Sequence, residues 1–361
     1  MVWVAVLHLL LLLPAALGSV LQTPQFANSV TPTDNVTPGA KASRICRPPP
    51  PRPITTAAAG SDVSIQRFCL VVGDSVSLGY TTPLSAVLNG TCDVVHAPYS
   101  DDGGACDTAY GLQCGPLWLG TSLDGAAAPR YDAIVFNFGL HDTNDEHKDE
   151  EARDEFVPLP QYGDNLVQFL SLIRKLQPSA RVAWVTSTPM HFDMHLNRNV
   201  QGYNRLAAER LVAAGLVNAS LDLYAVVVEQ CGTPPYYGSK AAPNASHHCP
   251  LINDNEEYHY NSAGWSLLAN KVGELFKALL SSAERQDGAG SDATSHASSA
   301  FLCPDNRTSC PANATCMPDS YSNTKWGCCM MPAAVSCGDS WHCCGAGQSC
   351  FANGTYNHLC R

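Results

Sequence analysis

The sequence predicts a three-layer α/β/α sandwich with a mainly parallel sheet, followed by a small disulfide-rich module of β-hairpins. Short, almost continuously apolar runs alternate with helical patterns between residues 62 and 280. A linker-like stretch at 281–300 separates this body from residues 301–361, which hold ten of the 17 cysteines. Parallel strands buried on both faces form continuous apolar runs, and a cysteine-dense tail indicates a disulfide framework.

The predicted strands are the four apolar runs that end at polar, glycine or proline residues: 67–74, 92–98, 131–139 and 180–189. Three helical patterns separate or follow them, and their apolar positions fall on one face. These positions include Leu166, Phe169, Leu170 and Ile173; Leu206, Ala213 and Ala214 beside Arg210; and Leu267, Leu268, Val272 and Leu275, after a cap at Asn261 or Ser262. In such sheets, functional sites lie at the carboxyl ends of the strands.

Composition narrows the classes of function. The chain has 361 residues, 45% of them hydrophobic, and a formal net charge of −11. Nucleic acid is therefore not expected as a partner, because its recognition needs a basic surface. Seventeen cysteines indicate an oxidising compartment.

The N-terminus is typical of a secreted chain. An apolar run over residues 2–17 ends in Ala16-Leu17-Gly18, which predicts a signal peptide over 1–18 although no Lys or Arg precedes the run. An N-terminal membrane anchor is the alternative. Residues 19–61 are rich in Pro and Thr and predict a disordered segment, and no later stretch is apolar enough to span a bilayer. We expect a secreted or extracellular protein, or one in the lumen of the secretory or vacuolar pathway.

Sequons for N-glycosylation agree with secretion. The expected glycosylation sites are Asn89, Asn218, Asn244, Asn306, Asn313 and Asn353. A further sequon, at Asn35, is the weakest, because Pro38 follows its Thr37.

The first motif with chemical meaning is residues 73–79 (GDSVSLG), where the first predicted strand ends and a helix begins. A serine at such a turn is presented at the sheet edge, near the positive end of the helix dipole. The block resembles that of the SGNH (GDSL-type) serine hydrolases, which have a flavodoxin-like α/β/α fold. The resemblance implies that Ser75 is the nucleophile.

Residues 256–265 (EEYHYNSAGW) resemble the last block of the same family, which supplies the base and its acid. His259 matches the base, and Glu256 stands where the family has Asp. A glutamate can also orient an imidazole, but its longer side chain leaves Asp254 and Glu257 open as alternatives.

Two loops between these blocks resemble the oxyanion-hole blocks of the family. Residues 100–105 (SDDGGA) offer Gly103 or Gly104, whose backbone N–H would face the oxyanion. Residues 135–142 (VFNFGLHD) carry His141 where the family has an asparagine donor. An imidazole can donate too, and Asn144 in the same loop is the weaker alternative.

No cofactor and no metal are expected. The sets His191/Asp193/His195 and His247/His248/Cys249 contain metal-ligand residue types but are interpreted as loop residues. Residues 141–155 carry eight acids against two bases and predict a solvated loop. As a rim of the site, this loop would favour neutral or cationic substrates over anionic ones.

The tail resembles a granulin domain through its Trp-Gly-Cys-Cys and Asp-x-x-His-Cys-Cys segments. That family has twelve cysteines, and the two positions missing here fall at Met317 and Ser336. In the usual connectivity these two positions bond to each other, so the resemblance implies five complete disulfides. They would use Cys303, Cys310, Cys316, Cys328, Cys329, Cys337, Cys343, Cys344, Cys350 and Cys360.

Seven cysteines lie before the tail, so at least one has no disulfide partner within this set. Proximity along the chain predicts Cys106–Cys114 and Cys231–Cys249. Cys69 and Cys92 either pair or remain buried thiols, and Cys46 is the candidate for the odd cysteine.

These observations predict a secreted serine esterase that hydrolyses acyl or acetyl esters of a glycan or lipid through a Ser-His-acid mechanism. Transfer of the acyl group to an alcohol is an alternative on the same fold. A secreted binding or signalling protein, with an inactive hydrolase scaffold and a protein partner on the granulin-like module, is a further alternative.

Overall fold

The computed structural model describes residues 42–47, 67–98, 104–120, 130–143, 156–238, 247–253, 256–283, 300–320, 322, 324–352 and 358–361. The predicted signal peptide and the sequons at Asn35, Asn244 and Asn353 lie outside these residues. Of the helices that the structure describes, none combines the length and the apolar character needed to cross a bilayer.

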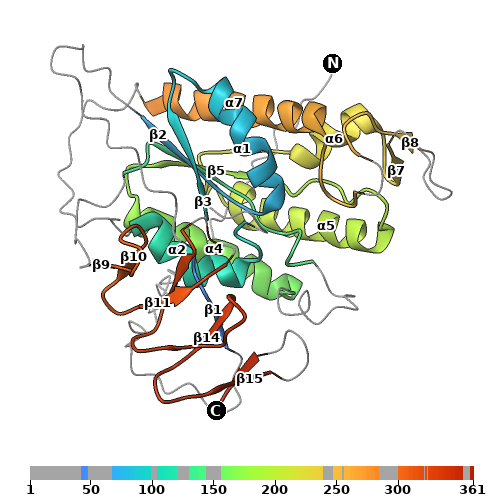
Figure 1. The fold of residues 1–361 in the computed structure, drawn as a ribbon. Helices are drawn as coiled ribbons and strands as arrows, with labels where there is room; N and C mark the ends of the chain where they lie inside the picture. The colour runs from blue at the N-terminus through green and yellow to red at the C-terminus, as the bar shows by residue number, and fades with distance from the viewer. Residues whose placement is uncertain are drawn as a thin grey trace, which may run out of the picture. The chain divides into compact units, whose positions relative to one another are not determined.

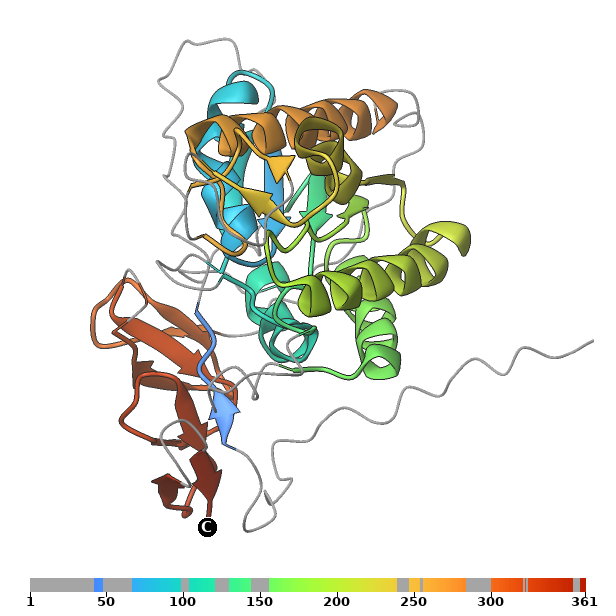
Figure 2. The same ribbon diagram turned by 90° about the vertical axis from the view of Figure 1, so that its right-hand side faces the viewer.

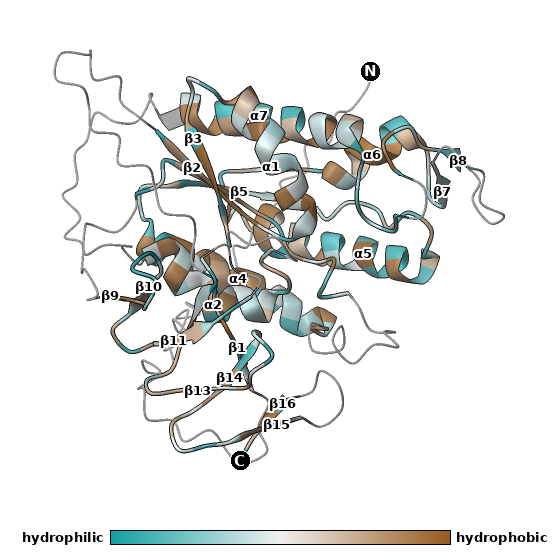
Figure 3. Cartoon of the chain, viewed as in Figure 1, coloured by the Kyte–Doolittle hydropathy of each residue, from teal (hydrophilic) through white to brown (hydrophobic). Residues whose placement is uncertain are grey.

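A five-stranded sheet, parallel throughout, forms the centre of the body and confirms the predicted α/β class (Figure 1). Its order is β3-β2-β4-β5-β6. The strands are β2 (Phe68–Val72), β3 (Asp93–Ala97), β4 (Ala133–Phe136), β5 (Arg181–Val185) and β6 (Ala219–Leu221). The first four coincide with the predicted apolar runs. They are predominantly brown in Figure 3, because both faces of the sheet are covered.

Helices cover both faces of the sheet, as a three-layer sandwich requires. Alternate strand residues point to opposite faces, so that Leu70 and Val72 lie in one apolar cluster and Cys69 and Val71 in the other. The first cluster takes in α2 (Thr108–Gly120), α4 (Leu159–Leu176) and α5 (Met194–Ala207), which continues as the π-helix η1 (Ala208–Ala213). The second takes in α1 (Ser75–Val87), α6 (Leu223–Cys231) and α7 (Ser262–Ala283).

The C-terminal module is a series of short antiparallel hairpins, as predicted. The pairs are β9 (Ala300–Leu302) with β10 (Ser309–Pro311), β11 (Thr315–Pro318) with β12 (Trp326–Cys329), β13 (Val335–Ser336) with β14 (His342–Cys344), and β15 (Cys350–Ala352) with β16 (His358–Cys360). A further, parallel pair in the body joins β7 (Tyr236–Tyr237) to β8 (His247–His248).

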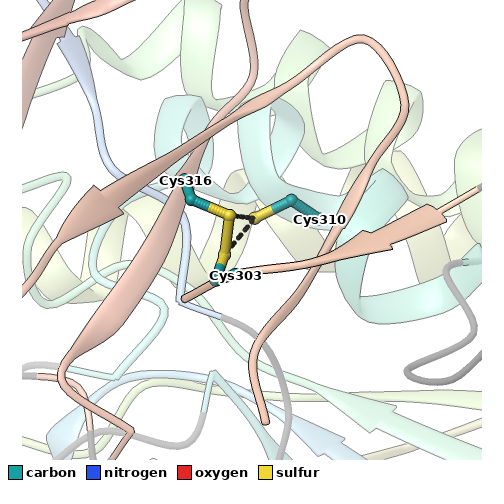
Figure 4. Close-up of side chains that lie close together, drawn as sticks. All are labelled: Cys303, Cys310 and Cys316. Atoms are coloured by element: carbon teal, nitrogen blue, oxygen red, sulfur yellow. Dashed lines mark hydrogen bonds between the residues drawn. A yellow bond between two sulfur atoms is a disulfide. The ribbon is translucent and has the colours of Figure 1, made fainter. Parts of the chain in front are cut away.

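Ten cysteines of the module form five disulfides: Cys303–Cys316, Cys310–Cys328, Cys329–Cys343, Cys337–Cys350 and Cys344–Cys360. Figure 4 shows Cys310 beside the Cys303–Cys316 bond. The three sulfurs lie close together, but each belongs to a disulfide, so none is a thiolate that could bind a metal ion. Because a module of this size buries little apolar surface, its disulfides provide much of its stability.

A short N-terminal strap, residues 42–47, joins the module to the body. Its strand β1 (Ser43–Arg44) pairs with β14, and Cys46 forms two backbone hydrogen bonds with Cys328, of 2.8 and 2.7 Å (Figure 2). On the other side, Cys46 is bonded to Cys114 of α2. The strap lies within the segment 19–61 that the composition predicts to be disordered. Its backbone is ordered because both neighbours supply hydrogen-bond partners.

Side chains reinforce both contacts of the strap. Arg44 forms an ion pair with Asp107, and the hydroxyl of Tyr110 donates to the carbonyl of Ile45 at 2.8 Å. Toward the module, Arg47 Nε lies 2.9 Å from Asp319 Oδ2 with both side chains fully buried. The Ile45 side chain is 1% exposed and belongs to one apolar cluster with Met317. Met317 stands at a position where a granulin domain would carry a cysteine. Met317 thus packs in an apolar cluster with Ile45 of the strap instead of forming a disulfide.

The disulfide between the strap and α2 differs from the predicted cysteine pairing. The expected Cys106–Cys114 disulfide is wrong, because Cys114 is bonded to Cys46, and Cys106 is instead the buried cysteine without a disulfide. Six helical residues rise about 9 Å, so Cys114 stands too far along α2 for Cys106 to reach it. Cys46, predicted as the odd cysteine, has a partner 68 positions away. Cys231 is bonded to Cys249, and Cys69 to Cys92.

We predict that the strap keeps the module on the body after the linker is cut. With a protease site inserted within 284–299, the two cleaved pieces of the wild-type chain should elute together in gel filtration. Ile45→Asp should separate them, because it places an unpaired charge in the apolar cluster at a cost of several kcal/mol.

Val335→Asp is the matched control, since Val335 is an apolar residue of the module that Ile45 contacts and is 39% exposed. Wild-type pieces that separate as readily as the Ile45→Asp pieces would contradict this role of the strap.

Candidate active site

Ser75 lies where β2 gives way to α1. Asp74 caps the helix, its Oδ1 accepting a 3.0 Å hydrogen bond from the N–H of Val76, and Ser75 is the first helical residue. The backbone N–H groups of this first turn have no partner within the helix and point toward its N-terminal side. Ser75 is half-buried, so its hydroxyl lies at the carboxyl edge of the sheet with access to solvent.

His259 approaches Ser75 from the loop before α7. Its Nε2 lies 2.9 Å from Ser75 Oγ, within hydrogen-bonding distance although the two residues are 184 positions apart. Asn261 holds the loop in place, because its side-chain amide donates to the carbonyls of Pro250 and Ile252 while its oxygen caps α7 at Ala263 and Gly264.

Packing of α1 on α7 aligns the two halves of this pair. The ring of Trp265 lies against Gly79 so closely that a Cβ there would sit 2.5 Å from it. The same indole packs edge-on against Tyr260, which is buried next to His259. A glycine one turn after the serine therefore allows the histidine loop to approach it.

Glu256 contacts the other nitrogen of the imidazole, with Oε2 3.4 Å from Nδ1 of His259. Their side chains are 44% and 36% exposed, so solvent screens this pair. Glu257 faces elsewhere and accepts hydrogen bonds from the N–H groups of Phe192 and Asp193. Burial raises the pKa of Glu257. Asp254, the third predicted alternative, lies outside the described residues.

His191 positions the loop that carries Glu256 and His259, a role that the sequence analysis did not assign. Its Nδ1 lies 2.6 Å from the carbonyl of Glu256, and its backbone N–H donates to the carbonyl of Glu257 at 2.7 Å. Burial lowers the pKa of His191 to about 4, so the ring is neutral near pH 7 and Nδ1–H is the donor. The sequence feature that could have indicated this role is the position of His191 just after strand β5.

Gly104 lies directly against the nucleophile turn. It forms an isolated antiparallel bridge with Asp74, and the next N–H, of Ala105, donates to the carbonyl of Gly73 at 2.7 Å. Its φ is +63°, and a Cβ would lie 2.4 Å from the carbonyl oxygen of Gly73. Only glycine fits here, because the backbone of this loop lies directly against that of Gly73 and Asp74. Gly103 lies outside the described residues.

His141 follows β4 at the same edge and is half-buried. Burial raises the pKa of Asp74, and the nearby imidazole of His141 opposes that rise. The neighbouring Asp142 is fully buried and accepts hydrogen bonds from the backbone and hydroxyl of Thr108. This anchors the loop that presents His141. Asn144 lies outside the described residues.

A second Ser–His contact lies beneath the site. Ser77 Oγ is 2.6 Å from His96 Nε2, but the two residues are 1% and 2% exposed. Burial lowers the pKa of His96 to about 4. Both side chains of this pair are closed to solvent, whereas Ser75 is half-buried.

The structure describes both histidine-containing sets that the sequence analysis interpreted as loop residues. His191 supports the loop that carries Glu256 and His259, and Asp193 caps α5 through the N–H groups of His195 and Leu196. Cys249 is in a disulfide beside the exposed His247 and His248.

The sequon asparagines that the structure describes are all exposed. They are Asn89, Asn218, Asn306 and Asn313.

Comparison with known families identifies the tail. Residues 319–356 match the granulin family model, which confirms the granulin-like module. Human progranulin is 46% identical over 50 residues, or 14% of this chain, and progranulin of Rattus norvegicus is 48% identical over 46 residues. The chain spans only 8% of the length of these two relatives.

Solved structures similar to this chain align with its larger part. They include a putative platelet activating factor from Streptococcus pneumonia and a lipase/acylhydrolase from Enterococcus faecalis, each with a TM-score of 0.41 and 14% identity over 59% of this chain, and 85% and 96% of their own. Est24, a carbohydrate acetylesterase from Sinorhizobium meliloti, has a TM-score of 0.39 and 10% identity over 59% of this chain and all of its own.

We predict that Gly104→Ala lowers both stability and any activity that depends on Ser75. The new methyl group would clash with backbone at 2.4 Å and add strain at positive φ. Gly90→Ala is the matched control, because Gly90 has φ +73° but nothing within 4 Å. Thermal unfolding and ester turnover should fall more for Gly104→Ala, and equal losses would contradict the close approach at Gly104.

Stability should fall as the pH drops from about 6.5 to about 4. In this window unfolded histidines bind protons, whereas folded His96 and His191, each with a pKa of about 4, do not. The stabilisation is complete above the unfolded pKa and is lost on acidification.

The unfolding midpoint of the wild type should be lower at about pH 4.5 than at about pH 7.5. The double variant His96→Gln/His191→Gln should show a smaller drop. The exposed pair His247→Gln/His248→Gln is the control. An unchanged pH dependence in the double variant would contradict the assignment.

Proposed function

We propose that this protein is a serine esterase of the SGNH type that carries a granulin-like module. The observation that carries the proposal is the 2.9 Å contact between Ser75 Oγ and His259 Nε2 at the carboxyl edge of the sheet. A hydroxyl hydrogen-bonded to an imidazole at the N-terminus of a helix is the arrangement that activates a serine nucleophile.

The reaction follows from this geometry. His259 Nε2 takes the hydroxyl proton as Ser75 Oγ bonds to the ester carbonyl carbon. Collapse of the tetrahedral adduct expels the alcohol, which receives the proton from His259. Water then gives a proton to His259 and attacks the acyl-serine, which releases the carboxylic acid and restores both residues. Glu256 orients Nδ1–H of His259 during each proton transfer.

The negative charge that develops on the carbonyl oxygen of the ester needs hydrogen-bond donors. These would lie on the side of Ser75 away from His259. The backbone N–H of Ser75, the N–H of Gly104 and the imidazole of His141 are the proposed set, with Gly103 as the neighbour that would share the role. Each preorganised donor contributes about 10²–10³ in rate. A histidine in place of an amide makes this donor dependent on its tautomer.

The substrate class is an acyl or acetyl ester of a glycan or lipid, and an alcohol in place of water would make the enzyme an acyltransferase. A cavity lined by Ser77, Leu140 and Leu223 measures about 10 Å³, which is room for about one water and too little for an acyl group. As a rim of the site, the acidic stretch after His141 would disfavour anionic esters.

Secretion is part of the proposal. Eight disulfides in the described residues are typical of an oxidising compartment. The binding-protein alternative is favoured by one observation, the exposed 3.4 Å contact of Glu256 with His259, which is looser than a hydrogen bond. Catalytic contacts, however, often tighten only when substrate binds.

Hydrolysis of p-nitrophenyl acetate by the purified full chain tests the proposal. Ser75→Ala and His259→Ala should each lower kcat at least ~10³-fold without loss of fold. An inactive but folded wild-type protein, or a Ser75→Ala variant with full activity, would favour the binding-protein alternative.

A second pair of variants identifies the acid. Glu256→Gln should lower kcat by about tenfold or more, because Nδ1 of His259 loses its carboxylate. Glu257→Gln should leave kcat near the wild-type value, since a Gln oxygen still accepts from Phe192 and Asp193. The reverse order would assign the acid to Glu257, and full activity in both variants would direct attention to Asp254.

A further inference from the structure

Three potential metal ligands converge in the granulin-like module, away from the proposed esterase site. The carboxylate oxygen Oδ2 of Asp339 lies 2.6 Å from Nδ1 of His342 and 3.1 Å from Nδ1 of His358. The two imidazole rings are stacked, with centroids 5.2 Å apart and planes 26° from parallel. Ligand atoms of the three side chains all lie within 4.8 Å of one another.

The surrounding backbone holds these side chains in place. The second oxygen of Asp339 accepts hydrogen bonds from the N–H groups of Trp341 and His342, at 2.9 and 2.8 Å. His342 begins β14 and is followed by Cys343 and Cys344, both in disulfides. His358 begins β16, and Cys360 two residues later is bonded to Cys344. The strands that present the two imidazoles are thus covalently joined, which reduces the entropy lost on binding a ligand.

The donor set has a definite chemical preference. Two imidazoles and one carboxylate suit Zn²⁺ and neighbouring transition metals, whereas Ca²⁺ and Mg²⁺ need several oxygen ligands. Sites with three protein ligands leave further positions for water. The side chains of Asp339, His342 and His358 are 23%, 12% and 11% exposed, so water can reach the cluster from one side.

We propose that Asp339, His342 and His358 bind one divalent transition-metal ion, with Zn²⁺ as the preferred ion. Neighbouring ligand atoms around a tetrahedral ion with bonds of ~2.0 Å are about 3.3 Å apart. The contact between His358 and Asp339 is already close to this value. The shorter contact between His342 and Asp339 must open by several tenths of an ångström, a shift that rotation of the carboxylate can supply.

The competing explanation for this cluster is hydrogen bonding alone, since one carboxylate can accept an N–H from each imidazole. His342 belongs to the Asp-x-x-His-Cys-Cys segment of the granulin resemblance, where such a bond would stabilise the turn. His358 lies outside that segment, at the start of β16, and adds a third ligand to the pair. Removal of His358 therefore separates the two explanations.

The test is a titration of the untagged, disulfide-bonded full chain with Co²⁺, a spectroscopic substitute for Zn²⁺. We expect one equivalent to bind with visible d–d absorption and without a sulfur charge-transfer band, and Zn²⁺ should abolish the signal. Millimolar Ca²⁺ or Mg²⁺ should leave it unchanged. His358→Phe should lower the affinity at least tenfold while retaining a ring that stacks on His342.

His248→Phe is the matched control, because His248 is an exposed β-strand histidine next to another histidine. It should bind as the wild type does. The proposal is overturned if the wild type shows no saturable binding, or if His358→Phe binds as tightly as the wild type. Ester hydrolysis is measured separately, because the site uses no residue of the esterase mechanism and either proposal can fail alone.

Discussion

The buried carboxylate of Asp74, at the turn between β2 and α1, is the constraint on which the rest of the site depends. The carboxylate caps α1 at Val76, and the backbone of the same residue forms the β-bridge with Gly104, so one residue contacts both the first turn of the helix and the neighbouring loop. Burial raises its pKa, and the imidazoles of His141 and His259 oppose that rise. These contacts hold the residue that directly precedes Ser75.

Parallel strands then bring the remaining groups to the same edge. The loops after β3 and β4 carry Gly104 and His141, and the segment after β5 carries His191, which supports the histidine loop. The packing of Trp265 against Gly79 completes the pair by bringing α7 onto α1. Distant segments of the chain thus meet because of the topology of the sheet, in agreement with the general position of sites in such folds.

The granulin-like module depends on a different constraint. It has five internal disulfides, and the strap contributes a strand, an apolar side chain and the buried ion pair of Arg47 with Asp319. One cysteine of the strap is bonded to α2, so the strap belongs covalently to the body and by its hydrogen bonds to the module. A module stabilised in this way is part of one assembly with the body.

Continuous apolar runs were sufficient to predict four of the five strands of the sheet, since burial on both faces leaves little freedom in composition. The fifth strand, β6, was not predicted, because its three residues are not fully buried and form no apolar run. The approach of Gly104 and His259 to the turn at Ser75 was expected from the motifs around these residues, and the structure brings them together there. The strap was not predicted, since its order comes from partners more than 60 positions away and its own composition is that of a linker. The Cys106–Cys114 pair was wrong for a related reason, because Cys114 pairs with the distant Cys46, and the rise of α2 keeps Cys106 out of its reach. His191 was missed because it acts through backbone carbonyls, which leave no motif.

The most direct test of the central claim is to locate the adduct of a fluorophosphonate probe by peptide mass mapping. The account predicts a single adduct on Ser75, none on the buried Ser77, and loss of labelling in a folded His259→Ala variant. A folded wild-type protein that remains unlabelled, or one labelled at a serine other than Ser75, would contradict it.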